Sequence, residues 1–153
     1  MTKIDPARHL VLTPGQHALL GELVEIVNQI ENMMIESLAT LDPAASTELK
    51  GLPGLGPQAK RWAKALSWRV AGQALAAQIL SVRSELTQFA EDRNDFIHAL
   101  YSGVYSIGYV QGYRATSATR HRTGNNRSTA ELEAIRNRAA TLSWSVDAII
   151  EAV

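Results

Sequence analysis

The stretch TPGQHALLGELVEIVNQIENMMIESLATL, residues 13–41, decides the fold class. Thr13 can cap the free amides of a helix, the proline after it tolerates the first helical position, and Gln16 can close a capping box. Apolar residues then recur at steps of three and four, which is typical of one buried helical stripe. They are Leu20, Leu23, Val24, Val27, Ile30, Met34, Leu38 and Leu41. We therefore predict one long amphipathic helix that ends at Asp42-Pro43.

A second helical pattern follows the turn GLPGLGP, residues 51–57, whose last proline is well placed to start a helix. Apolar residues keep helical spacing over residues 59–89, with a bend expected near Gly72. They are Ala59, Trp62, Ala63, Leu66, Val70, Ala74, Ala77, Leu80, Val82, Leu86 and Phe89. This stretch is long enough to span the domain. Asp92, a favourable cap, predicts the start of a new helix.

The C-terminal helix is indicated by a second capping box, Ser128-Thr-Ala-Glu131. Apolar residues at near-heptad spacing follow it, namely Leu132, Ile135, Ala139, Leu142, Val146 and Ile149. This seam can pack inside the chain or serve a partner helix in a homodimer. The region near 105–122 alternates apolar with small or polar residues, which predicts a short extended or hairpin segment. Together the patterns predict an all-α antiparallel bundle of four to five helices, forming one domain over residues 1–153.

Composition limits the classes of protein to which the chain can belong. It has 153 residues and no cysteine, which excludes disulfides, thiol nucleophiles and cysteine-ligated metals. The N-terminus lacks the apolar core of a signal peptide, and the longest stretch without a formal charge, residues 96–113, contains His98, Gln111 and three glycines. We therefore expect a cytoplasmic protein that does not enter a membrane.

Charge is balanced in total but uneven along the chain. Fifteen basic residues match fifteen acidic ones, yet every charge between Glu48 and Glu85 and between Asp95 and Glu131 is positive. The first predicted helix carries four glutamates and no base. This segregation permits a basic face on a neutral protein, and an ordinary solvated surface is the alternative.

The segment Glu91-Asp-Arg-Asn-Asp-Phe-Ile-His98 concentrates the polar chemistry of the chain. On a helix, Asn94 and His98 share one face, whereas Phe96 lies on the opposite, apolar face. Arg93 projects to the middle of the apolar side and must meet a carboxylate, lie at a helix end, or face an anion site. Because Arg93 and His98 are five residues apart, they point about 140° from each other. A joint site therefore needs Arg93 in a loosened first turn, or a second copy of the motif.

Arg93-Asn94, followed after three residues by His98, resembles the signature of the HEPN superfamily, whose small helical domains carry an arginine, a polar residue and a histidine as a ribonuclease site. The resemblance covers these six residues and the helical layout of most of the chain. It implies metal-independent RNA cleavage in which a ribose 2′-hydroxyl attacks the adjacent phosphate. Arg93 would stabilise charge on the phosphoryl oxygens, and His98 would take or return a proton. Asn94 would orient the imidazole or hold the substrate.

The resemblance also implies partners, namely RNA, a second copy whose motif meets the first across a two-fold axis, and, in a toxin or defence system, an antitoxin protein. Some toxins of the superfamily carry a modified tyrosine two residues after the histidine. This chain has Leu100 there and Tyr101 one residue later, so that regulation is not carried over. Glu91, Asp92 and Asp95 offer the alternative that Arg93 is a salt-bridged structural residue.

Other candidates are less specific. A basic stretch with tyrosines nearby could track a phosphate backbone and stack bases, or could be a plain exposed loop; it holds Arg114, Arg120, His121, Arg122 and Arg127. Three tryptophans in helical segments, Trp62, Trp68 and Trp144, are expected in the core or an interface. No metal site or cofactor is expected, and His9 and His17 receive no role. The competing function is a non-enzymatic helical module for dimerisation or protein binding.

Overall fold

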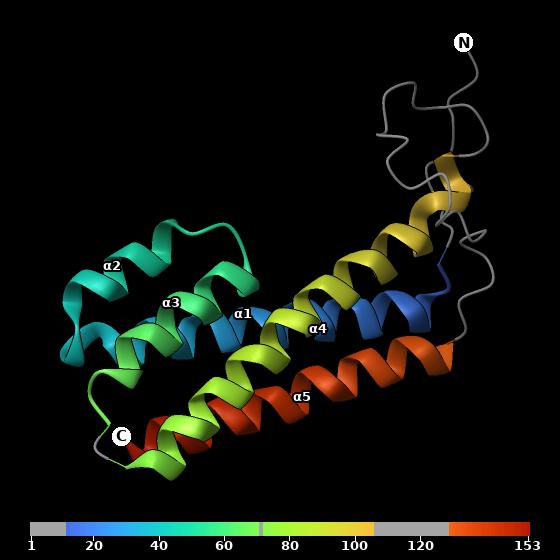
Figure 1. The fold of residues 1–153 in the computed structure, drawn as a ribbon. Helices are drawn as coiled ribbons and strands as arrows, with labels where there is room; N and C mark the ends of the chain where they lie inside the picture. Colours follow the sequence, from blue (N-terminus) through green and yellow to red (C-terminus); the bar gives the residue numbers. More distant parts are fainter. Residues whose placement is uncertain (1–11, 71, 106–128) are drawn as a thin grey trace.

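The computed structural model describes residues 12–70, 72–105 and 129–153, which fold into a bundle of five helices (Figure 1). The helices are α1 (Pro14–Leu41), α2 (Pro43–Gly51), α3 (Leu55–Ser67), α4 (Gln73–Tyr105) and α5 (Thr129–Ala152). No strand occurs within these described ranges. The predicted all-α class and helix number are confirmed. Apart from Tyr105, the segment expected to be extended near 105–122 lies outside the described residues.

The first helix begins and ends where its caps predict. The Thr13 hydroxyl accepts a hydrogen bond from the Gln16 amide at 3.2 Å, and the Gln16 side chain accepts one from the Thr13 amide at 3.0 Å. At the other end, the Asp42 amide donates to the Leu38 carbonyl, and the Asp42 carboxylate accepts from the Ala45 amide at 3.1 Å. Asp42 therefore closes α1 and caps α2, a short helix that the sequence analysis did not predict.

Residues 59–89 do not form one long helix, because α3 ends at Ser67 and α4 begins at Gln73 in the opposite direction. The bend expected near Gly72 falls at this reversal and is sharper than predicted. Gly54, with φ of 84°, takes the left-handed conformation that favours glycine just before α3. The apolar positions of α4 do not continue the periodicity of α3, so some of its buried positions differ from those predicted. Ile79 is consequently buried, whereas Leu80, predicted to face inward, is 46% exposed.

Successive helices run in alternating directions, as the predicted antiparallel bundle requires (Figure 1). The first and last helices run the same way side by side, and Arg136 of α5 meets Glu22 of α1 at 2.9 Å. α4 is antiparallel to both of them. The Asp92 carboxylate of α4 lies 2.6 Å from the Arg138 guanidinium of α5. The short helices α2 and α3 lie over one end of these three long helices, where α3 packs on α4.

The core joins the inner faces of all five helices. Leu132, Ala139, Leu142, Val146 and Ile149 of the C-terminal seam are buried within the chain, so this seam packs internally rather than facing a partner. A smaller cluster of Leu12, Phe96 and Leu132 closes the other end of the bundle. No helix among the described residues is both long and apolar enough to cross a bilayer.

Several residues predicted to be buried are not. In α1 the stripe is confirmed except at Val24 and Leu41, which are 51% and 40% exposed. Of the three tryptophans, Trp62 is fully buried and its indole N–H donates to the Ser37 hydroxyl at 3.0 Å. Trp68 and Trp144 are 82% and 73% exposed, so the expectation of a core position is wrong for both within this chain.

Candidate functional site

The Arg93–His98 motif lies in the interior of α4, not at the start of a helix. The predicted helix start at Asp92 is wrong because α4 passes through this residue without a break. The Asp92 carboxylate instead accepts hydrogen bonds from Gln88 at 3.0 Å and from Arg138 at 2.6 Å. These two bonds, the Arg138 bond foremost, hold the pKa of Asp92 below its usual value. Arg93 therefore does not have the loosened first turn that one version of the sequence hypothesis required.

Arg93 is half-buried, and the start of α3 lies beside the preceding turn of α4. A Cβ atom placed on Gly56, in the first turn of α3, would lie 3.8 Å from the Ala90 Cβ. Arg93 follows one turn after Ala90 on the same side of α4. Its apolar stem can thus remain against the bundle while the guanidinium reaches solvent.

The Arg93 guanidinium turns toward Asn94. Its Nε and Nη2 atoms donate to the Asn94 Oδ1 atom at 3.3 and 3.0 Å. Asn94 and His98 are both exposed and lie one helical turn apart. The side chain of Arg93 thereby reduces the 140° separation expected from the backbone alone, and the guanidinium lies next to the polar face of the helix.

Glu31 of α1 lies close enough to Arg93 for their charges to interact. Burial raises the pKa of the Glu31 carboxyl, and the positive charge of Arg93 partly opposes this rise. Glu31 and Arg93 are 62 positions apart in the chain, and this pairing was not among the sequence hypotheses. A carboxylate of another helix thus contributes to the electrostatic environment of Arg93.

The opposite side of the motif anchors α4. Phe96 is buried with Leu12 and Leu132, as its place on the apolar face predicts. One turn before the motif, the Arg138 guanidinium lies 5.5 Å from the centre of the Phe89 ring while it holds Asp92. These contacts fix the rotation of α4, so that Asn94 and His98 face solvent.

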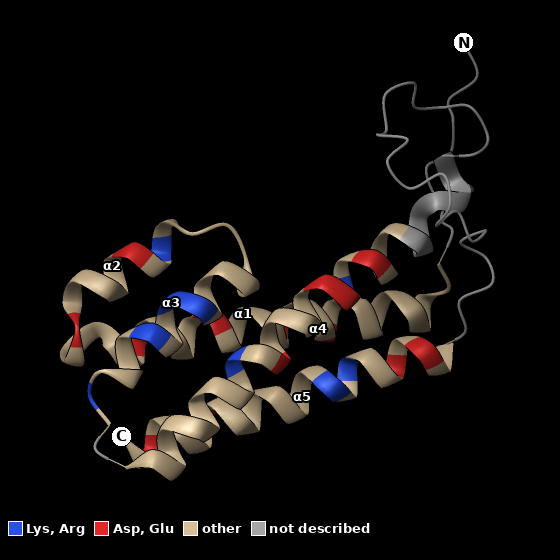
Figure 2. Cartoon of the chain, viewed as in Figure 1, with Lys and Arg blue, Asp and Glu red and all other residues tan. Residues whose placement is uncertain are grey.

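Basic residues gather on α3 in the described part of the chain (Figure 2). Lys60 and Lys64 are exposed one turn apart, while Arg61 pairs with Glu48 and lowers the pKa of that carboxyl. Nearby, Arg69 lies 3.4 Å from the Asp42 carboxylate. The predicted nucleic-acid-binding residues are Arg114, Arg120, Arg122 and Arg127, and all four lie outside the described residues.

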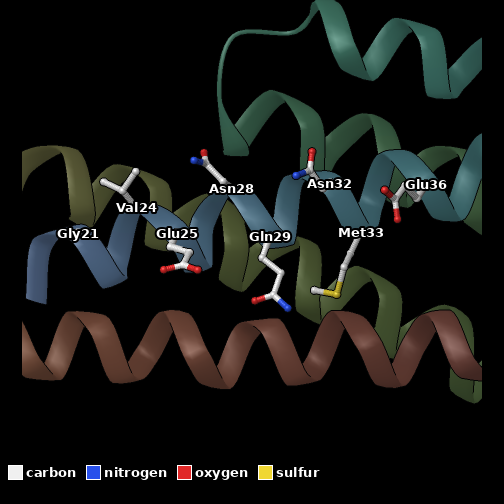
Figure 3. Close-up of a pocket in the computed structure, with 8 residues that line it drawn as sticks. All are labelled: Gly21, Val24, Glu25, Asn28, Gln29, Asn32, Met33 and Glu36. Carbon is white, nitrogen blue, oxygen red and sulfur yellow. The ribbon is translucent and has the colours of Figure 1, made fainter.

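A shallow, open hollow lies elsewhere, along the outer face of α1, and neither Arg93 nor His98 lines it (Figure 3). Among the described residues, no group of three or more histidine, aspartate or glutamate side chains is placed to hold a metal ion. Comparisons with protein-family models, with curated proteins and with solved structures give no match for this chain.

Proposed function

We propose that this chain is a HEPN-like domain that binds RNA and cleaves it without a metal ion, with Arg93, Asn94 and His98 as its site. One observation carries the proposal: the Arg93 guanidinium donates two hydrogen bonds to Asn94, which lies one turn before the exposed His98. A cation, an amide and an imidazole therefore share an accessible strip of α4. That set of groups can bind a phosphate and move a proton beside it.

The chemistry follows from these three groups. Arg93 would bind the phosphoryl oxygens, whose negative charge grows as the 2′-oxygen attacks phosphorus. The new O2′–P bond forms as the P–O5′ bond breaks, which leaves a 2′,3′-cyclic phosphate and a 5′-hydroxyl. His98 would accept the proton of the 2′-hydroxyl or return one to the departing 5′-oxygen. Asn94 would hold the guanidinium in place until the phosphate replaces it as hydrogen-bond acceptor.

The negative charge of Glu31 affects how strongly Arg93 would bind a phosphate. The charge of Arg93 acts on the Glu31 carboxyl and would also attract a phosphate, so the carboxylate would weaken phosphate binding at Arg93. Loss of the Glu31 charge should therefore strengthen RNA binding. Loss of Arg93 should remove the attraction between its guanidinium and the RNA phosphate.

The test is cleavage of single-stranded RNA in EDTA by the wild type and by Arg93→Ala and His98→Ala. We expect both variants to lose cleavage while circular dichroism shows an intact helical fold. The matched controls are Arg83→Ala, another half-buried arginine of α4, and His17→Ala, an exposed histidine of α1; both should cleave like the wild type. Equal activity of the wild type and both site variants would rule the proposal out.

The resemblance further suggests a cytoplasmic toxin or defence protein with an antitoxin partner, and this belongs to the same proposal. Expression of the wild type should then arrest growth, and Arg93→Ala should relieve the arrest at equal protein levels. A growth effect that persists in this variant would point to the alternative, a non-enzymatic interaction module. The exposed hollow on α1 is the observation that favours such a module.

A further inference from the structure

The exposed side of α3 carries two lysines and a tryptophan in one row. Lys60, Lys64 and Trp68 are spaced four residues apart, so they follow one another along the same side of the helix. Trp68 is the C-cap residue of α3 and has helical backbone angles, so the row extends to it. All three residues are exposed, and Trp68, at 82%, is the most exposed large apolar side chain in the described part of the chain. We call these three residues the α3 ridge.

The acidic residues near the α3 ridge are already held by arginines. Glu48 of α2 pairs with Arg61, and the Asp42 carboxylate lies 3.4 Å from Arg69. α3 itself contains no aspartate or glutamate. Within the described residues, neither lysine of the α3 ridge forms an ion pair. The positive charge of these lysines is therefore available to attract an anion from solution.

The row that forms the α3 ridge begins beside the proposed RNA site. A Cβ atom on Gly56, one turn before the first lysine of the ridge, would lie 3.8 Å from the Ala90 Cβ of α4. On α4, a row with the same spacing leads from Ala90 to Asn94 and His98. Both rows therefore start where the two helices touch.

The two rows turn toward the same face of the α3–α4 pair. A step of four residues rotates the side-chain direction by about 40° in the sense of a right-handed helix. α3 and α4 run in opposite directions (Figure 1), so rows that start at their contact rotate toward one common side and lead away from each other along the pair. The α3 ridge continues the line of Asn94 and His98 across the contact. Residues 56–68 add about 18 Å of α3 to the about 12 Å of α4 spanned by residues 90–98.

We propose that the α3 ridge binds single-stranded RNA beside the α4 site, with Lys60 and Lys64 on neighbouring phosphates and the Trp68 ring stacked on a base. This inference rests on the proposed function, because the ridge holds the strand that the α4 site cleaves. Cations along a backbone, together with an aromatic ring that stacks on bases, bind single strands without reading their sequence. The neighbouring Arg69 donates to the Leu41 and Ala65 carbonyls, both at 3.0 Å, and so fixes the backbone next to the ring.

An anionic membrane surface is the other partner that lysines beside a tryptophan would suit. A helix that lies in a membrane interface presents a whole face of large apolar side chains to the lipid. α3 exposes no second large apolar side chain besides Trp68. The spacing and the position of the α3 ridge therefore favour RNA.

RNA length separates binding at the α3 ridge from binding at the α4 site. Fluorescence anisotropy with labelled single-stranded 2′-O-methyl RNA should show an affinity that rises between about 4 and about 10 nucleotides, as the strand reaches the ridge. Trp68→Ala should weaken binding of the longer RNA about fivefold or more, and Trp68→Tyr should weaken it less. Combining Lys60→Ala with Lys64→Ala should reduce the slope of log Kd against log salt by about 1.4. Trp144→Ala on α5 and Lys50→Ala on α2 are the matched controls, and both should keep the gain with length.

Cleavage kinetics distinguish a failure of the α3 ridge from a failure of the site. With the longer RNA carrying natural 2′-hydroxyls, the ridge variants should raise KM and leave kcat unchanged, because they do not touch the reacting groups. Cleavage with the same KM and the same gain in affinity with length in the ridge variants would overturn this inference and leave the proposed function standing. RNA that binds through the ridge and is never cleaved would support the ridge and overturn the proposed function alone. A wild type that binds phosphatidylserine vesicles but not the RNA would assign the ridge to a membrane surface and overturn the inference.

Discussion

The hydrogen bond between Trp62 and Ser37 should contribute measurably to the stability of the bundle. The Trp62 indole is fully buried, and its N–H donates to the Ser37 hydroxyl at 3.0 Å. Ser37 in turn donates to the Met34 carbonyl at 2.8 Å. Ser37→Ala removes the acceptor and leaves the indole N–H buried without a partner, which costs about 1–3 kcal/mol. The loss of the Met34 bond adds little, because Ser37 is a half-buried residue on a helix whose carbonyls already have backbone donors.

A double-mutant cycle separates this bond from the packing around it. In a Trp62→Phe background the indole N–H is absent, so Ser37→Ala should cost only about 0–0.5 kcal/mol. The coupling energy between the two positions should therefore be about 1 kcal/mol or more. Urea unfolding followed by circular dichroism measures all four proteins without relying on tryptophan fluorescence. Equal costs of Ser37→Ala in the two backgrounds would refute the assignment of this bond as a stabilising contact.

Three further predictions concern charged residues. Asp42→Ala removes the cap of α2 and the Arg69 contact and should cost about 1–2 kcal/mol in urea unfolding, whereas Asp42→Asn should cost less. Because the folded-state pKa of Asp92 is lowered, its contribution should be present above about pH 4 and lost below it, and the Tm of Asp92→Asn should vary less over that range. The folded-state pKa of Glu31 is raised, so its contribution is lost as pH rises; Glu31→Gln should raise the Tm at pH 7 and match the wild type below about pH 4.

Local patterns in the sequence predicted the elements that local physics determines. The cap at Thr13 and the apolar steps of residues 13–41 identified α1, and the seam after Glu131 identified α5, because helix periodicity and capping act over a few residues. The orientation of the motif was predicted for the same reason, with Phe96 buried and His98 exposed.

Features that depend on how helices meet could not be predicted in this way. One periodic pattern was carried through the break before Gln73, so Leu80 was assigned inward instead of Ile79. Asp92 has the residue type of a cap, but its partner Arg138 lies 46 positions away on α5. The charges of Glu31 and Arg93 interact only because the folded bundle brings α1 and α4 near each other, which neither segment specifies alone.

The proposed ribonuclease site requires Arg93 and His98 to contact the same RNA. NMR titration with a short single-stranded RNA that carries 2′-O-methyl groups tests it most directly, since such an RNA can bind but cannot be cleaved by its own 2′-hydroxyl. We predict that the Arg93 Nε and the His98 imidazole resonances shift together over one range of RNA concentration, and that His17 does not shift. Saturating RNA that leaves both the Arg93 and the His98 signals unchanged would rule out this site.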